Sequence, residues 1–94
     1  MSIGFTWDRR KAESNRRKHR ITFEEAATAF GDPVARIQDN PAHSQGEIRE
    51  VIVGTTASGR LVLVSFTERD GMIRIISARR ATAHERRDYE ETTS

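Results

Sequence analysis

Apolar residues recur with two different spacings along the chain, and the change of spacing separates predicted helices from predicted strands. Four apolar side chains between residues 23 and 30 follow one helical stripe: Phe23, Ala26, Ala27 and Phe30. Aliphatic and β-branched side chains instead dominate three later stretches, residues 48–54, 61–67 and 72–78. The pattern therefore predicts helices in the first third of the chain and strands after them.

Polar residues mark where the two N-terminal helices begin and end. Asp8 is the predicted cap of a first helix that runs to about His19. Thr22 and Glu25 form a capping box for the second helix, in which the Thr22 hydroxyl accepts from an amide of the first turn and Glu25 reaches back to the cap. Gly31 fits the position just past the end of this second helix.

Turn signals divide the rest of the chain into four strands and a last helix. The Ser-Gly pair at 58–59 and the Asp-Gly pair at 70–71 predict hairpin turns, and a short strand at residues 34–38 precedes the apolar stretches. Thr82 and Glu85 form a second capping box, so a last helix is expected to begin near Thr82. This order predicts an α+β fold with two N-terminal helices, a four-stranded antiparallel sheet and a C-terminal helix.

Two-residue turns at both hairpins would fix the strand register. That register places Val53 opposite Val64 and Arg49 opposite Glu68. The apolar side chains that it gathers on one face are Val51, Val53, Val62, Val64, Phe66, Ile73 and Ile75. It also places Arg79 about six residues along the strands from the pair of Arg49 and Glu68, a distance of roughly 20 Å at ~3.3 Å per residue. Either a bulge changes this register or only one of the two arginines is catalytic.

Composition and charge narrow the class of protein. The 94 residues suit one domain, residues 1–94, and they include no cysteine. Seven Lys or Arg residues lie in 9–20 and six arginines lie in 69–87, although the net charge is only +2. Basic ends suggest contact with a polyanion, and solvated helix faces are the alternative. No apolar stretch approaches the ~18 residues of a membrane span, so we expect a cytoplasmic protein without membrane contact.

The residue types that remain favour chemistry on RNA. The sequence has no glycine-rich phosphate loop, no Gly-x-Ser-x-Gly elbow and no metal-ligand spacing, so neither a cofactor nor a metal is expected. Arg, Lys, His, Glu and Tyr suit metal-independent cleavage, in which the ribose 2′-hydroxyl attacks the adjacent phosphate. A base and an acid then move protons, while guanidinium groups stabilise the charge on phosphorus.

Four residues are the catalytic candidates: Arg79, Glu68, Arg49 and His19. A histidine can give or take a proton near neutral pH, and Glu68 is a second candidate base. Each has a structural alternative, since His19 ends a helix, Glu68 can pair with Arg49 across strands, and Arg79 can pair with an acid. The candidate RNA-binding residues are Lys11, Lys18, Arg69 and Arg80.

Several of these residues belong to a longer pattern. Residues 7–19 read W-D-x-x-K-x-x-x-N-x-x-K-H. The later members of the pattern are Phe23-Glu24-Glu25-Ala26, Phe30, Asp32-Pro33, Gly46-Glu47-x-Arg49, Thr67-Glu68-Arg69, residues 75–81 (IISARRA), Glu85 and Tyr89. With this pattern the chain resembles the BrnT family of type II toxins almost end to end. Arg20 and Arg80 depart from it, because the family often has Gly and Lys there.

The resemblance implies a RelE-like fold, a ribonuclease activity that inhibits translation, and neutralisation by a BrnA-like antitoxin with a ribbon-helix-helix DNA-binding part. It also implies a heterotetramer of two toxins and two antitoxins that binds its own promoter DNA through the antitoxin. Two other classes stay open from the residues alone. One is a non-catalytic RNA- or DNA-binding regulatory module, and the other is a structural subunit whose basic ends bind an acidic partner.

Overall fold

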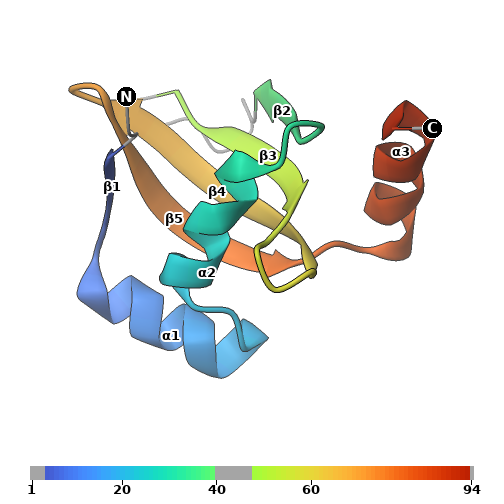
Figure 1. Ribbon diagram of the computed structural model, residues 1–94. Coiled ribbons are helices and arrows are strands. Elements are labelled where there is room, and N and C mark those ends of the chain that lie inside the picture. The colour runs from blue at the N-terminus through green and yellow to red at the C-terminus, as the bar shows by residue number, and fades with distance from the viewer. Residues whose placement is uncertain (1–3, 40–47, 94) are drawn as a thin grey trace.

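The computed structural model describes residues 4–39 and 48–93, and within them lie three helices and five strands (Figure 1). The helices are α1 (Arg9–His19), α2 (Phe23–Thr28), which continues into the 3-10 turn η1 (Ala29–Gly31), and α3 (Ala83–Thr93). The strands are β1 (Gly4–Trp7), β2 (Arg36–Asp39), β3 (Glu50–Thr55), β4 (Leu61–Arg69) and β5 (Met72–Arg80). The predicted α+β class is confirmed.

The strands form one sheet in the order β1-β5-β4-β3-β2. Strand β1 runs parallel to β5, and the other neighbouring pairs are antiparallel. The prediction of a four-stranded antiparallel sheet is therefore wrong, because it lacks β1. That strand has only four residues and pairs with a strand almost seventy positions away, so no local alternation of side chains reveals it.

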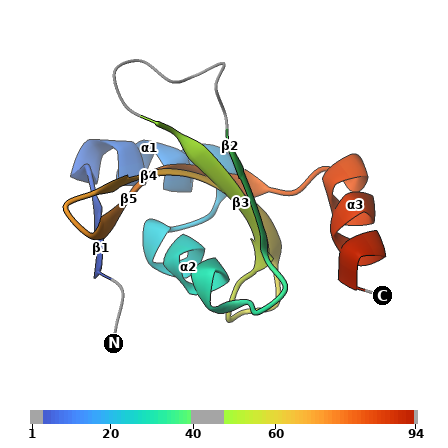
Figure 2. The ribbon, with the colours of Figure 1, turned by 90° about the horizontal axis from the view of Figure 1, so that it is seen from above.

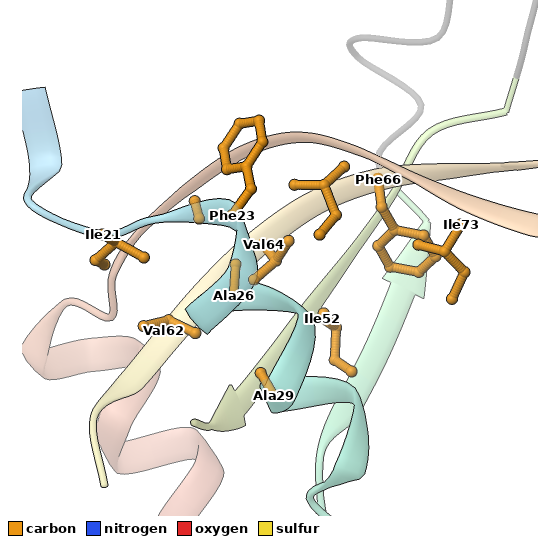
Figure 3. Close-up of a cluster of buried hydrophobic side chains, with 11 residues drawn as sticks. Ile21, Phe23, Ala26, Ala29, Ile52, Val62, Val64, Phe66 and Ile73 are labelled. Carbon is orange, nitrogen blue, oxygen red and sulfur yellow. The ribbon is translucent and has the colours of Figure 1, made fainter. Parts of the chain in front are cut away.

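The hydrophobic core lies between α2 and one face of the sheet. Figure 3 shows side chains of α2 and η1 beside apolar side chains of β3, β4 and β5. Its members that are at most 2 % exposed are Ile21, Phe23, Ala26, Ala29, Ile52, Val62, Val64, Phe66, Ile75 and Ala78. Burying one large side chain of this kind contributes about 1.5–3 kcal/mol, so the cluster holds α2 on the sheet. Helix α3 stands apart at the other end of the molecule from α1 (Figure 2).

The turn between β3 and β4 shifts the predicted register by one residue. The backbone bond from the Thr56 amide to the Arg60 carbonyl closes a three-residue loop, and Gly59 in that loop has a φ of +90°. A three-residue loop with a left-handed residue is a common hairpin connection, but it pairs one residue differently from a two-residue turn. Val53 therefore lies opposite Leu63, and Ile52 replaces Val51 and Val53 in the helix-covered core.

The second hairpin keeps the predicted turn but contains a bulge further along. Arg69 pairs with Met72, as predicted, and Phe66 pairs with Ile75. The next pair is Ser65 with Ser77, so Ile76 is an extra residue on β5. Of the two alternatives in the sequence, the bulge is the one that the structure adopts. It places Arg79 opposite Leu63, on the face of the sheet that turns away from the core.

Helix α1 continues the edge of the sheet beyond β1. Strand β1 pairs only with residues 72–75 of β5. Further along, the side-chain amide of Asn15 donates to the Ala78 carbonyl at 2.8 Å and accepts from the Ala78 amide at 3.0 Å. It also donates to the Ile21 carbonyl at 3.1 Å. This buried side chain thus satisfies backbone groups that a strand would otherwise pair, and it fixes α1 against β5.

Candidate functional site

The sheet face opposite the core carries a depression of about 490 Å³. Its lining residues come from β2, β3, β4, β5 and α3 and from the residue before β3: Gln38, Asp39, Arg49, Val51, Leu63, Ser65, Ile76, Ser77, Arg79 and Glu85. The one-residue shift at the first hairpin and the bulge at the second bring Arg49 and Arg79 to this same depression. The strand register predicted from two-residue turns, which places the two arginines far apart along the sheet, is therefore wrong.

A carboxylate and a backbone carbonyl hold Arg79 at this depression. Its Nη1 and Nη2 atoms each donate to one carboxylate oxygen of Glu85, both at 2.8 Å, and Nη1 also donates to the Arg80 carbonyl at 3.1 Å. Hydrogen bonds from Arg79 hold the pKa of Glu85 at about 2, although burial raises it. The same pair raises the pKa of Arg79. Both groups are therefore charged at any working pH, and the predicted pairing of Arg79 with an acid is present.

Glu85 has a second task at the start of α3. Its backbone amide donates to the Thr82 hydroxyl at 3.1 Å, and its carboxylate accepts from the Thr82 amide at 2.9 Å. The predicted capping box at Thr82 is therefore confirmed in both directions. Sequence reasoning assigned Glu85 only to this cap and did not connect it to Arg79, because the contact depends on how α3 leaves the sheet.

The other predicted capping box is only half formed. The Glu25 amide donates to the Thr22 hydroxyl at 3.0 Å, as predicted. The Glu25 carboxylate does not return to the cap but accepts from Arg60, Ser58 and Thr56 of the β3–β4 turn. These contacts fasten the turn to α2, on the side of the molecule that carries the core.

Arg49 approaches the depression from the segment just before β3. Its side chain is half-buried and its Nε atom is buried. The Thr67 hydroxyl donates to the neighbouring Ile48 carbonyl at 2.7 Å, which fixes the backbone at this point. The two arginines thus reach one depression from different segments, Arg49 from the residues before β3 and Arg79 from β5.

Glu68 lies away from the two arginines. It pairs with Ile73 and is exposed on the side of the sheet that carries the core. Burial raises the pKa of Glu50, and the nearby charges of Glu68 and Asp39 raise it further, which places Glu68 near other acids. The predicted row with Arg49 opposite Glu68 is therefore wrong, because the register differs by one residue.

The remaining predicted residues do not line the depression. His19 is half-buried at the last position of α1, and Arg69 and Arg80 are exposed at opposite ends of the β4–β5 hairpin. Lys11 and Lys18 are exposed on α1. The predicted RNA-binding residues are thus spread over the molecule instead of forming one patch.

Helical geometry nevertheless assigns Lys11 and Lys18 to one side of α1. Asn15 faces β5, and Ala12 packs against the core cluster. Because successive residues of a helix are about 100° apart around its axis, Ala12 lies to one side of Asn15 and both lysines lie to the other side. They therefore share the side of α1 that turns away from the core.

Tyr89 joins α3 to the body of the domain. Its hydroxyl donates to Asp32 at 2.6 Å and lies 3.2 Å from the Thr55 hydroxyl oxygen. The hydrogen bond to Asp32 raises the pKa of Tyr89. This contact explains how a polar helix stays in place without a large apolar face.

Within residues 4–39 and 48–93, no group of three or more His, Cys, Asp or Glu side chains could hold a metal ion. None of the helices there has the length and apolar character that a bilayer crossing requires.

Comparisons with known proteins agree with the fold and the sequence pattern. A family model described as "Ribonuclease toxin, BrnT, of type II toxin-antitoxin system" matches residues 7–85. The crystal structure of the Brucella abortus ribonuclease toxin, BrnT, has a TM-score of 0.65 and 19% identity, and the match covers 86% of this chain and 99% of that chain. At this identity the likeness to the crystal structure shows the fold alone. No curated protein sequence matches the chain.

Proposed function

Because the chain belongs to the BrnT family of ribonuclease toxins of type II toxin–antitoxin systems, we propose that it is an endoribonuclease, which cuts RNA at internal positions and needs no metal ion. The observation that carries this proposal is the meeting of Arg49 and Arg79 at one depression. Two guanidinium groups can supply the positive charge that a metal ion supplies in other nucleases, because the transition state gathers negative charge on the phosphate oxygens. The resulting loss of RNA would inhibit translation.

In this mechanism the RNA supplies its own nucleophile. The 2′-hydroxyl oxygen attacks the adjacent phosphorus, and the 5′-oxygen of the next nucleotide leaves. Arg79 and Arg49 bind the phosphate oxygens and stabilise the charge that develops there. His19 and Glu68 stay proposed for proton transfer, but neither lines the depression, so we place most of the rate enhancement on the two arginines.

Binding of the RNA strand extends beyond the depression. Lys11 and Lys18 lie on one side of α1, and α1 is fixed to the strand that carries Arg79. Arg80 follows Arg79 directly in β5, and Arg69 lies at the other end of the β4–β5 hairpin, next to the turn. We propose that the two lysines make most of the additional phosphate contacts, because they share the side of α1 that turns away from the core and α1 is bonded to β5 at Ala78, next to Arg79.

The partner of a type II toxin is an antitoxin. We propose a BrnA-like antitoxin with a ribbon-helix-helix part, a complex of two toxins and two antitoxins, and binding of that complex to promoter DNA through the antitoxin. These proposals rest on the family and not on contacts in this chain. We place the toxin in the cytoplasm, where its RNA substrate is found.

The test is cleavage of RNA by the purified chain in EDTA. Cleavage that persists in EDTA and disappears when a BrnA-like antitoxin is added supports the proposal. Activity that requires added Mg²⁺ or Mn²⁺ contradicts the metal-independent mechanism. RNA binding without cleavage would instead support a non-catalytic regulatory module, the alternative that the basic ends of the chain favour.

A further inference from the structure

Glu85 occupies one edge of the Arg79 guanidinium and leaves another edge open. A guanidinium carries five N–H donors in a planar fork. Three of them are used here, two by the Glu85 carboxylate and one by the Arg80 carbonyl. Within residues 4–39 and 48–93, the Nε hydrogen and the second Nη2 hydrogen have no hydrogen-bond acceptor. These two hydrogens point in parallel, which is the geometry that binds two oxygens of one phosphate.

The carboxylate that holds Arg79 is itself firmly placed. The Thr82 backbone amide donates to the Glu85 carboxylate at the start of α3, and Tyr89 ties the same helix to Asp32 one turn later. Arg79 is the second-last residue of β5, so the pair joins a strand end to a helix start. Both partners line the depression, so an anion that enters it meets the guanidinium.

From this arrangement we propose that Glu85 is a positioning residue, which holds Arg79 by the Nη1–Nη2 edge so that the Nε–Nη2 edge receives the substrate phosphate. The inference rests on the proposed ribonuclease function and adds a residue to it. An unrestrained arginine side chain samples many rotamers, and binding a phosphate must first order it. A carboxylate that orders the side chain in advance lowers this cost and keeps the productive orientation.

The structure offers an opposing hypothesis that the same experiment tests. Glu85 can instead block Arg79, so that the phosphate must displace the carboxylate. The two hypotheses predict opposite signs. A positioning carboxylate makes cleavage slower when it is removed, whereas a blocking carboxylate makes cleavage faster.

The chain provides a matched pair of variants for this test. Glu85→Gln removes the charge from the pair but keeps a side chain that suits the capping box. Of the hydrogen-bonding groups of the cap, Thr82→Ala removes only the hydroxyl that accepts from the Glu85 backbone amide, which weakens the cap by about 1 kcal/mol. It keeps the Thr82 backbone amide that donates to the Glu85 carboxylate, and so leaves the Arg79–Glu85 pair intact. Melting temperature measures the loss of the cap, and kcat and KM for RNA measure the loss of positioning.

We expect Glu85→Gln to lower kcat about tenfold, because a neutral amide holds the guanidinium with one oxygen and about half the hydrogen-bond strength. We expect Thr82→Ala to melt at a lower temperature with an unchanged kcat. An increase of kcat in Glu85→Gln would overturn the proposal in favour of blocking. An equal fall of kcat in both variants would overturn it in favour of a purely structural role.

A second measurement does not depend on cleavage. Inorganic phosphate is titrated into the intact protein while NMR follows the Nε–H signal of Arg79 and the backbone amide of Thr82, which donates to Glu85. The proposal predicts that the Arg79 signal shifts and the Thr82 amide stays. Parallel shifts of both signals would show that phosphate displaces Glu85, and no shift at Arg79 would show that the edge binds no phosphate. Either result overturns the inference, whereas failure to cleave RNA would overturn the proposed function alone.

Discussion

Two arginine–glutamate pairs of this chain share their chemistry and differ in which edge of the guanidinium the carboxylate occupies. At the β3–β4 turn, Arg60 donates to Glu25 from Nε and Nη2, and Glu25 also accepts from the hydroxyls of Thr56 and Ser58. Hydrogen bonds hold the pKa of Glu25 at about 2, chiefly those from Arg60. The pair is thus closed: the carboxylate takes the parallel Nε–Nη2 edge, and the second Nη2 hydrogen goes to the Arg20 carbonyl, so neither parallel edge of this guanidinium stays whole.

At the depression the same kind of pair is open. Arg79 gives its Nη1–Nη2 edge to Glu85 and keeps the Nε–Nη2 edge. The pKa of Glu85 is also held at about 2, chiefly by the hydrogen bonds from Arg79. The lowered pKa alone therefore does not separate a structural pair from a candidate site. The intact Nε–Nη2 edge of Arg79 and the surrounding depression do.

The largest expected effect belongs to Arg79. We expect Arg79→Ala to slow RNA cleavage by about 10²–10³, or about 3–4 kcal/mol, because it removes a contact to the developing charge. The free energy of unfolding should change by only about 1 kcal/mol, since the partner Glu85 is partly exposed and keeps its cap contact. Cleavage assays and thermal melts on the same preparation measure both. The variant should still bind the antitoxin.

The outcome that would remove Arg79 from the site is clear. A soluble Arg79→Ala variant that melts like the parent and arrests growth at the parental rate would contradict the prediction. The comparison of the two pairs would then fail, and Arg49 would become the leading candidate. A variant that loses melting temperature together with toxicity would instead give Arg79 the structural role that Arg60 has.

Arg60 should show the reverse pattern. We expect Arg60→Ala to lower the free energy of unfolding by about 1.5–3 kcal/mol, because the charged bonds of Arg60 join the β3–β4 turn to Glu25 of α2 and to the Arg20 carbonyl at the end of α1. Each kcal/mol corresponds to roughly 4–8 °C in melting temperature for a chain of this size. Below the melting range, RNA cleavage by the folded protein should equal that of the parent. A loss of cleavage at a temperature where the variant is folded would contradict the structural assignment.

The two pairs also show what the sequence can and cannot predict. Helix starts at Thr22 and Thr82 depend on neighbouring residues, and both were predicted correctly. The strand β1 and the partners of Glu25 and Glu85 depend on distant segments, and none of these was predicted. The register failed by one residue because a three-residue turn and a two-residue turn look alike in the residues 57–59. Together with the bulge on β5, that single residue decides whether Arg49 lies opposite Glu68 or shares a depression with Arg79.

A smaller effect is expected at the surface of α1. Replacing both Lys11 and Lys18 with Gln should weaken RNA binding and flatten its dependence on salt. Two lost phosphate contacts change the slope of log K against log salt by roughly 1.4 for a single strand. The measurement is RNA affinity at several salt concentrations.

The matched control for the lysines lies on the same helix. Arg16 and Arg17 both contact Glu13, at 2.6 and 3.4 Å, so their charges are already shared with an acid. Replacing these two with Gln should change the salt slope less. An unchanged slope in the lysine variant would contradict RNA binding by this side of α1. It would point instead to a solvated face or to a surface that meets the antitoxin.

The smallest expected effect is the response to acid, and its sign follows from the two lowered pKa values. Glu25 and Glu85 have folded pKa values of about 2, below the ordinary 4.5. Each therefore binds fewer protons in the folded state, so its stabilisation is complete above about pH 4.5 and is lost as the pH falls toward 2. We expect the parental melting temperature to fall between pH 5 and pH 3.

Single Gln variants assign that loss to each pair. Glu25→Gln and Glu85→Gln should each melt with a shallower dependence on pH over this range, because the substituted group no longer takes up a proton on unfolding. Glu13→Gln is the control. The pKa of Glu13 is also held at about 2 by Arg16 and Arg17, but that carboxylate is 46% exposed on α1, so solvent screens the pair and the slope should stay near the parental one. Equal slopes in all three variants would show that exposure does not distinguish these carboxylates. The acid response would then arise from other charged groups, and the closed and open pairs would differ only in the whole guanidinium edge that Arg79 keeps.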